Sequence, residues 1–399
     1  MSGWRVRRIL AAAVAAAIAA VLFARTREPD YSKVAVSAVA DLERELESLR
    51  ERLGIPGMSA AIAERDRVVW ARGFGWANVE RPVAVDPAVT SFHLASVTKP
   101  YAATVVLQLA DEGRLDLDAP VSEFGIDMPR DKPVRVWHLL SHTSGGTPGT
   151  TFRYDARAFG ALTTVVERAT GRPFAAELTD RIVRRLRLEH TAPNPREINR
   201  DACRSQLSSR LLNLCGTAEQ AEHARGTFAA SGLDRRAADR DLAVGYARRW
   251  GRHLWPAGLF GPMRPAPPLT DLFASGGLVA SAVDVARFSI ALDQGVLLQK
   301  PTLARTFQPA IETAGATPKF GLPWFLQEYR GSLLAWQFGQ AVESSSLLLK
   351  IPESQVTFVV LANSDGLSRR RRLGDHGDVL GSPAAMLFLN WYSSGKRLR

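Results

Sequence analysis

The chain contains 399 residues, of which 46% are apolar and 23% are charged, and its mean hydropathy is −0.08. This composition excludes a wholly disordered chain, a collagen-like repeat and a polytopic membrane protein. The net charge is +11, but the cations are spread along the chain without a nucleic-acid-binding motif, so we expect a generally basic surface and no nucleic-acid partner.

The first 27 residues have the pattern of a targeting segment. Arg5, Arg7 and Arg8 precede an apolar run over residues 9–23. A basic head followed by about 15 apolar residues is typical of a secretory signal, and an uncleaved anchor in the membrane fits equally well. We therefore expect residues 1–27 to be a signal peptide or an N-terminal membrane anchor, with the rest exported to the periplasm, the exterior or the outer face of the inner membrane.

Helical and strand patterns follow this segment in long blocks. Residues 28–33 are predicted to be a linker, and residues 34–53 carry apolar side chains at helical spacing before Gly54. Two strands and a helix come next, at 58–64, 68–74 and 98–112. The middle, from about 115 to 280, is helix-and-loop, with a Pro/Gly-rich loop at 256–268. The last part is predicted to form a helix at 282–292, strands at 323–329, 333–338, 344–351 and 357–362, and a closing helix at 383–391.

This order of elements predicts the architecture. Consecutive strands with tight turns form an antiparallel sheet, and the two terminal helices would cover one of its faces. The expected fold class is an α/β (α+β) sandwich, with an antiparallel sheet flanked by N- and C-terminal helices and an inserted, mainly helical domain. We assign residues 34–90 and 282–399 to the sandwich and residues 91–281 to the helical domain.

A serine and a lysine stand one helical turn apart at the start of the predicted helix 98–112. Ser96 and Lys99 have the spacing S-x-x-K, which places both side chains on one face. A hydroxyl is a poor nucleophile until a base removes its proton, and a desolvated amine one turn away can be that base. Alone, the motif is weak, because serine is also a common helix cap.

Other stretches strengthen this interpretation. They are FHLASVTK at 92–99, HLLSHTSG at 138–145, ASGGL at 274–278, DVARF at 284–288, SSLLL at 345–349 and LANS at 361–364. With these stretches in this order and spacing, the chain resembles the class C-like branch of the serine β-lactamase and penicillin-binding-protein family from about residue 40 to its C-terminus. The resemblance implies a β-lactamase/transpeptidase-like fold, Ser96 as the acylated nucleophile and Lys99 as its partner, with no cofactor and no metal.

The family's second motif, Tyr-x-Asn, matches Tyr154-Asp155-Ala156. The resemblance implies that Tyr154 shares proton transfer with Lys99, and a phenol beside a cation is expected to have a lowered pKa. The asparagine is replaced by Ala156, so a contact with the amide of a peptide-like substrate is lost. Asp155 could supply a carboxylate, but we favour a role as the cap of the next helix.

The third motif, Lys-Thr-Gly or His-Thr-Gly on the strand that lines the site, matches Gln337-Phe338-Gly339. Gly339 is kept, as a close approach of two backbones requires. Gln337 would offer the substrate only neutral hydrogen bonds, about half as strong as charged ones. By resemblance, the oxyanion hole would consist of the backbone N–H groups of Ser96 and Gln340. Trp336 either lines the pocket or fills the core.

Two further pairs of residues have a weaker pattern. His138 and His142 are four residues apart but lack the glutamate of a zinc protease motif, so the stretch around them is predicted to be a helix end and a glycine turn near the site. Cys203 and Cys215 are predicted to form a disulfide in an exported protein, and two buried free thiols are the alternative.

These residues together predict an exported serine hydrolase. Ser96 would form a covalent acyl-enzyme with an ester or amide, and Lys99 and Tyr154 would transfer the proton. The altered second and third motifs favour ester or amide substrates that lack the β-lactam carboxylate, and the expected partner is a small-molecule or peptidoglycan-like substrate. The alternatives are a β-lactamase or DD-peptidase proper, and a non-catalytic binding or scaffold protein on the same fold.

Overall fold

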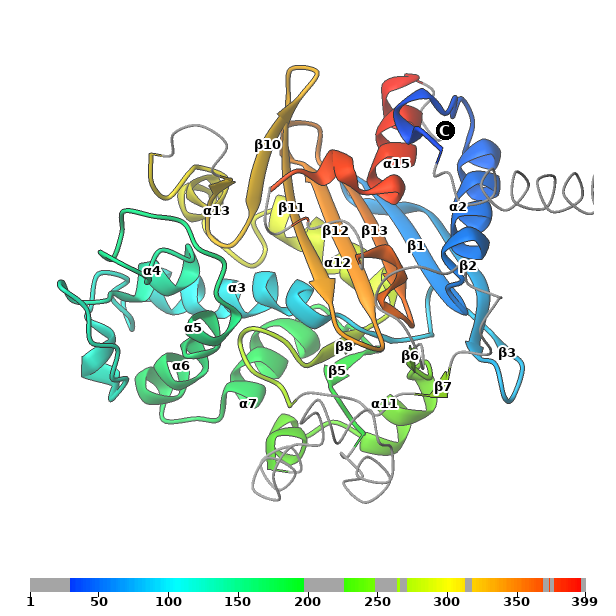
Figure 1. The fold of residues 1–399 in the computed structure, drawn as a ribbon. Coiled ribbons are helices and arrows are strands. Elements are labelled where there is room, and N and C mark those ends of the chain that lie inside the picture. Colours follow the sequence, from blue (N-terminus) through cyan, green and yellow to red (C-terminus); the bar gives the residue numbers. More distant parts are fainter. Residues whose placement is uncertain are drawn as a thin grey trace, which may run out of the picture.

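The computed structural model describes residues 29–196, 226–247, 264–265, 271–312, 318–368, 373 and 377–395. Its centre is an eight-stranded antiparallel sheet in the order β3-β2-β1-β13-β12-β11-β10-β9 (Figure 1). The strands of this sheet are β1 (Gly57–Glu64), β2 (Arg67–Asn78), β3 (Val83–Ala84), β9 (Lys319–Phe320), β10 (Phe325–Tyr329), β11 (Ser332–Gln340), β12 (Ser345–Ile351) and β13 (Val356–Ala362).

The central strands β12 and β13 are buried along their whole length, because helices cover both faces of the sheet. Side chains on β13 alternate between two apolar clusters. Phe358 and Val360 belong to one cluster, and Val359 and Leu361 belong to the other. The predicted antiparallel sandwich is confirmed, and it has helices on both sides of the sheet.

Two helices from opposite ends of the chain, α2 (Val39–Leu53) and α15 (Pro383–Ser393), pack together on one face (Figure 1). Helix α2 begins five residues later than predicted, because the Asp41 carboxylate accepts the Ser37 and Ala38 N–H groups and fixes the helix start. The segment before it was predicted to be a linker. There Tyr31 is buried, and its carbonyl accepts a hydrogen bond of 2.8 Å from Asn390 of α15.

Helix α12 (Ala282–Asp293) covers the opposite face and contacts β1, β2 and β13. A buried ion pair joins this helix to the sheet. Lys350 on β12 is fully buried, and its Nζ lies 2.9 Å from Asp293 Oδ2. The same ammonium also donates to the hydroxyls of Ser289 and Thr357. Burial lowers the pKa of Lys350, although the Asp293 charge opposes that change.

A mainly helical region lies beside the sheet, to the left in Figure 1. The boundaries predicted for it as a domain stay a prediction. A small sheet in the order β4-β8-β5 connects this region to the strands. The elements are α3 (Thr98–Asp111), α4 (Val136–Leu140), α5 (Ala156–Gly160), α6 (Leu162–Thr170), α7 (Phe174–Leu178), β4 (Phe92–His93), β5 (Thr191–Pro193) and β8 (Leu278–Ala280).

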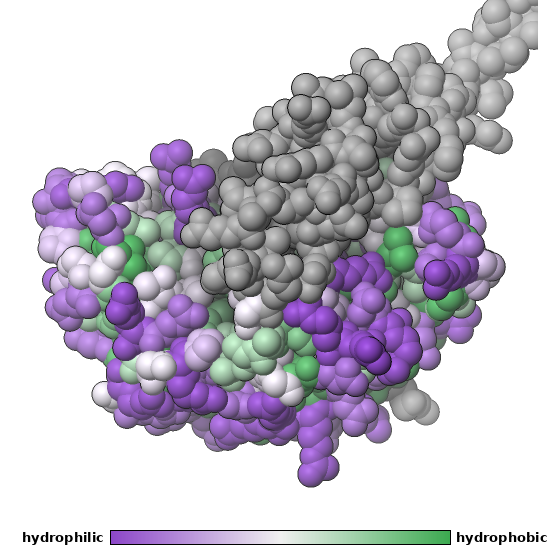
Figure 2. Space-filling view, turned by 90° about the horizontal axis from the view of Figure 1, so that it is seen from below, coloured by the Kyte–Doolittle hydropathy of each residue, from purple (hydrophilic) through white to green (hydrophobic). Residues whose placement is uncertain are grey.

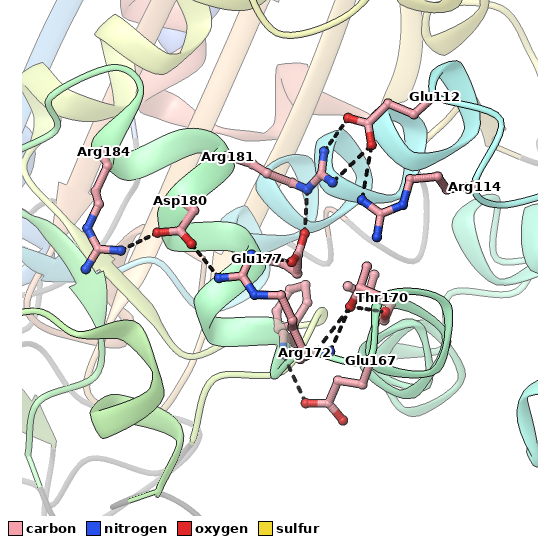
Figure 3. A network of polar contacts seen from close by, with 11 residues as sticks. Glu112, Arg114, Glu167, Thr170, Arg172, Glu177, Asp180, Arg181 and Arg184 are labelled. Atoms are coloured by element: carbon pink, nitrogen blue, oxygen red, sulfur yellow. Dashed lines mark hydrogen bonds and ion pairs between the residues drawn. The ribbon is translucent and has the colours of Figure 1, made fainter.

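A network of charged side chains fixes α7 against the end of α3 (Figure 3). Glu177 on α7 is almost fully buried and accepts hydrogen bonds from Arg172 at 2.7 Å and Arg181 at 2.6 Å. Arg181 also bonds Glu112, directly after α3, and holds the pKa of that carboxyl below its usual value. A buried carboxylate needs such partners, and the network joins α7 to the C-terminal end of α3, the helix that carries Lys99.

On the side seen from below, the described residues at the surface are mostly hydrophilic, with smaller apolar areas between the polar side chains (Figure 2). Among the described residues, no helix is both long and apolar enough to cross a membrane. The predicted targeting segment at 1–27 and the predicted Cys203–Cys215 disulfide lie outside the described residues, as does most of the loop at 256–268. Those three assignments stay predictions.

Candidate active site

Ser96 lies on a 3₁₀ turn, η2 (Ala95–Val97), that leads directly into α3. Ala95 has φ of 47°, a left-handed conformation that a residue with a Cβ rarely adopts. Strand β11 passes so close that a Cβ on Gly339 would lie 2.2 Å from the Leu94 carbonyl oxygen. The predicted close approach at Gly339 is therefore confirmed, and it brings the end of β11 to the residues before Ser96.

Lys99 is fully buried beside Ser96. Its Nζ lies 2.8 Å from Ser96 Oγ and donates to the Ser275 carbonyl oxygen at 3.1 Å. The aromatic rings of Tyr154 and Phe159 lie 5.0 and 5.4 Å from the same nitrogen. No carboxylate in the described part of the chain forms an ion pair with it, so burial lowers the pKa of Lys99 to about 7. A large share of the amine is therefore neutral near pH 7 and can accept a proton from Ser96.

Tyr154 places a buried hydroxyl next to Ser96. The expected lowering of its pKa is wrong. Burial raises the pKa of Tyr154 well above the usual value, and the nearby Ser96 hydroxyl opposes that change only in part, since the Tyr154 hydroxyl has no hydrogen-bond partner among the described residues. Tyr154 is thus a protonated phenol at neutral pH, which suits a proton donor.

Asp155 is the cap of helix α5, as we favoured from the sequence. Its Oδ1 accepts hydrogen bonds of 2.9 Å from the N–H groups of Arg157 and Ala158. The carboxylate is therefore used at the helix start, and the methyl group of Ala156 stands where the family motif has an amide.

Two residues in and next to the third motif, Gln337 and Trp336, are buried inside the protein. Gln337 is fully buried, its Nε2 donates to the Pro323 carbonyl at 3.0 Å, and its Oε1 accepts from the Phe338 N–H at 3.1 Å. Its predicted contact with substrate is therefore wrong, because both polar atoms are used inside the protein. Trp336 is also fully buried and stacks on Phe325 at 4.4 Å between ring centroids, so it fills the core and does not line a pocket.

Phe338 is the residue of this motif that borders the site. It is partly exposed, and its ring centroid lies 6.1 Å from that of Tyr154. Gln340 ends β11, where it pairs with Ser345, one residue after the close contact at Gly339. The oxyanion hole of Ser96 and Gln340 N–H groups stays a prediction.

Sequence reasoning missed the roles of Ser275 and Phe159. The ASGGL stretch was noticed, but a backbone carbonyl that holds the Lys99 amine has no signature in residue type.

His138 and His142 each accept a backbone N–H at Nδ1, from Arg135 and Asp155 respectively. The described residues contain no group of three acidic, histidine or cysteine side chains that could hold a metal ion.

Comparisons with known proteins give the family. A family model described as Beta-lactamase matches residues 42–380. The chain is 22% identical over 293 residues to the putative penicillin-binding protein PbpX of Bacillus subtilis (strain 168). That alignment covers 72% of this chain and 66% of PbpX. The chain is also 32% identical over 200 residues to Esterase EstB of Burkholderia gladioli. That alignment covers 37% of this chain and 49% of EstB. The matches therefore span about half to two thirds of these two relatives.

Among solved structures, the fold resembles the octameric penicillin-binding protein homologue from Pyrococcus abyssi, with a TM-score of 0.68 and 21% identity. That match covers 90% of this chain and 78% of the other. Such a likeness shows a shared fold, and the family model extends over most of the chain from α2 to the segment before α15. The chain therefore belongs to the Beta-lactamase family of hydrolases.

Proposed function

We propose that this protein is a serine hydrolase that forms a covalent acyl-enzyme on Ser96 with an ester or amide substrate. The observation that carries the proposal is the 2.8 Å contact between Ser96 Oγ and the Nζ of Lys99, a buried amine with a pKa of about 7. A desolvated amine next to a hydroxyl is a means of activating a nucleophile.

Acylation follows from this geometry. Neutral Lys99 takes the Ser96 proton while Oγ bonds to the substrate carbonyl carbon, and the N–H groups of Ser96 and Gln340 hold the oxyanion. When the intermediate collapses, the phenol of Tyr154 gives its proton to the leaving oxygen or nitrogen. The Lys99 ammonium then returns the Ser96 proton to Tyr154. In the second half, water attacks the acyl carbon and gives a proton to Lys99. Lys99 then passes this proton to Ser96 Oγ as the bond between Oγ and the acyl carbon breaks, and the acid is released.

The substrate that this site favours is a neutral ester. Gln337 stands where the family motif has a cation, and its amide is used by Pro323 and Phe338, so nothing at this position holds a substrate carboxylate. The partly exposed ring of Phe338 near Tyr154 supplies an apolar contact. The similarity to Esterase EstB points the same way. Amides, β-lactams and D-Ala-D-Ala peptides are the substrates to compare with esters.

A non-catalytic scaffold on this fold is the rival function. Burying an amine without an acidic partner costs several kcal/mol of folding free energy when it is charged. Lys99 has such a place among Ser96, Ser275, Tyr154 and Phe159. A protein that only binds a partner gains nothing from this arrangement, whereas a hydrolase gains a base that works near neutral pH.

The pH profile tests the proposal. Because the neutral amine is the active form, kcat/KM for a p-nitrophenyl ester should rise about tenfold per pH unit below pH 7 and level off above it. The rate should be measured from pH 5 to 9 beside nitrocefin and a D-Ala-D-Ala peptide, with esters turned over fastest. A profile that is flat across pH 7 contradicts Lys99 as the base, and absence of turnover with every substrate supports the scaffold.

We also propose that residues 1–27 direct export, on the basis of the three arginines and the apolar run over residues 9–23. Fused to a reporter that is active only in the periplasm, this segment should give activity. A matched fusion in which two alanines of the apolar run are replaced by arginine should lose it, because charge in the run blocks membrane insertion. The assignment is contradicted if the two fusions give equal reporter activity, or if neither fusion is active.

A further inference from the structure

The HTSG stretch has no part in the chemistry above, yet His142 holds Tyr154 and its two chain neighbours through three interactions. Its carbonyl oxygen accepts a hydrogen bond of 2.8 Å from the N–H of Arg153, and its Nδ1 accepts one of 3.1 Å from the N–H of Asp155. Both neighbours of Tyr154 along the chain are thus bonded to one residue. The imidazole also packs on the phenol, with ring centroids 4.3 Å apart and planes tilted by 30°.

His142 is itself held firmly. Its φ is 56°, a left-handed conformation in which histidine, asparagine and aspartate are the enriched residues after glycine. The side chain is 1% exposed, and its ring packs against Phe159 and Phe320 at centroid distances of 5.3 and 5.1 Å. Phe159 also contacts the Lys99 ammonium, so His142, Tyr154 and Lys99 share one set of packing contacts.

The imidazole is neutral and does not take part in proton transfer. Its Nδ1 accepts a hydrogen bond, so the ring proton is on Nε2. Burial, together with the charge of Lys99, lowers the pKa of His142 well below its usual value. At neutral pH it therefore leaves the proton exchange to Ser96, Lys99 and Tyr154, and it acts through position.

We propose that His142 is a positioning residue for Tyr154: by accepting the backbone N–H groups of the residues before and after Tyr154 and packing on its ring, it fixes the phenol hydroxyl beside Ser96. The inference rests on the proposed function, in which Tyr154 gives a proton to the leaving group. A misplaced donor affects substrates according to how much their leaving group needs that proton. A poor leaving group such as ethoxide needs it, whereas p-nitrophenolate does not.

The test compares two esters of one acid, the ethyl ester and the p-nitrophenyl ester. His142→Phe keeps an aromatic ring and removes the acceptor for the Asp155 N–H. We expect it to lower kcat for the ethyl ester by about ten- to a hundredfold, with much less effect on the p-nitrophenyl ester and on either KM. His142→Asn should keep most of the wild-type kcat for the ethyl ester. Its Oδ1 occupies the place of the histidine Nδ1, and asparagine tolerates the left-handed backbone.

A matched control comes from the same stretch. His138 also accepts a backbone N–H at Nδ1, from Arg135 at 2.9 Å, and its ring packs on Trp137. His138→Phe removes an equivalent hydrogen bond away from Tyr154. Any loss of kcat that comes from lower stability alone should therefore be equal for the two esters in this variant. His142→Gly, which adopts the left-handed backbone without strain, gives the same comparison if His142→Phe does not fold.

Double variants separate the inference from the function on which it rests. In a Tyr154→Phe background, His142→Phe should cause no further loss with the ethyl ester, because the donor that it positions is absent. If Tyr154→Phe alone leaves ethyl-ester turnover unchanged, the proposed proton donor is wrong. If Tyr154→Phe lowers that rate but His142→Phe acts equally on both esters, or adds its full effect to that of Tyr154→Phe, the role of His142 is overturned.

Discussion

Replacement of Ser96 by alanine should abolish hydrolysis, with a loss of about a thousandfold or more in kcat/KM. The hydroxyl is the group that would carry the acyl chain, and Lys99 Nζ lies 2.8 Å from its oxygen. A fluorophosphonate probe should add its mass to the Ser96 peptide of the wild-type protein and not to the variant. The fold should remain, because Ser96 Oγ caps no helix and the loss of its hydrogen bond with Lys99 costs about 1 kcal/mol of unfolding free energy.

A second serine provides the control. Ser281 caps α12, where its Oγ accepts the Asp284 N–H at 3.2 Å, so Ser281→Ala should cost a similar free energy of unfolding and keep both labelling and turnover. Wild-type turnover by Ser96→Ala would show that another group is the nucleophile. Label on the Ser96 peptide without turnover of any ester would point to a site that acylates and does not deacylate.

Replacement of Asp293 by asparagine should destabilise the protein by about 3 kcal/mol at pH 7. Lys350 is fully buried, and Asp293 is the carboxylate that lies 2.9 Å from its Nζ, so the substitution leaves a buried cation without its counter-charge. Burial already lowers the pKa of Lys350 in the folded state. The unfolded chain therefore binds more protons between that lowered value and about 10.4, and stability rises with pH in this window.

The loss of unfolding free energy caused by Asp293→Asn should therefore be smaller at pH 9.5 than at pH 7, because a neutral lysine tolerates the apolar site. Urea unfolding of both proteins at the two pH values measures it. A double variant, Asp293→Asn with Lys350→Met, should regain most of the stability at pH 7, since it buries no charge. A difference below about 0.5 kcal/mol at pH 7 for the single variant would mean that the ion pair does not hold α12 to the sheet.

The long elements of the fold were predictable because their patterns are strong. Strands β12 and β13 are near-continuous apolar runs separated by turn residues, and α3, α12 and α15 have helical spacing. The short strands β4, β5 and β8 were not found, since two or three residues carry no periodicity. Two of them nevertheless flank the site, because β4 leads to Ser96 and β8 follows Ser275 closely.

The site was predictable to the level of residue type. The S-x-x-K spacing does bring Lys99 to Ser96, and Tyr154 does lie beside them. The burial of Gln337 could not be predicted, because a motif match gives the position of a residue along a strand and not what covers its side chain. Strand β11 is covered on both faces around Trp336 and Gln337, so the polar side chain bonds to Pro323 and stays away from solvent.

The pairing of β1 with β13 has a consequence for how the chain folds. Met58 pairs with Ala362, so the middle of the sheet is closed by residues about 300 positions apart, a contact of very high order that forms late. A ribosome adds about 5–20 residues per second, so the β1–β2 hairpin waits roughly 15–60 s with one edge unpaired before β13 emerges. Helices α3 to α7, with their local contacts, have time to form in that interval. The open apolar edge of β1 is therefore where we expect a chaperone to bind the nascent chain, and where misfolding would start.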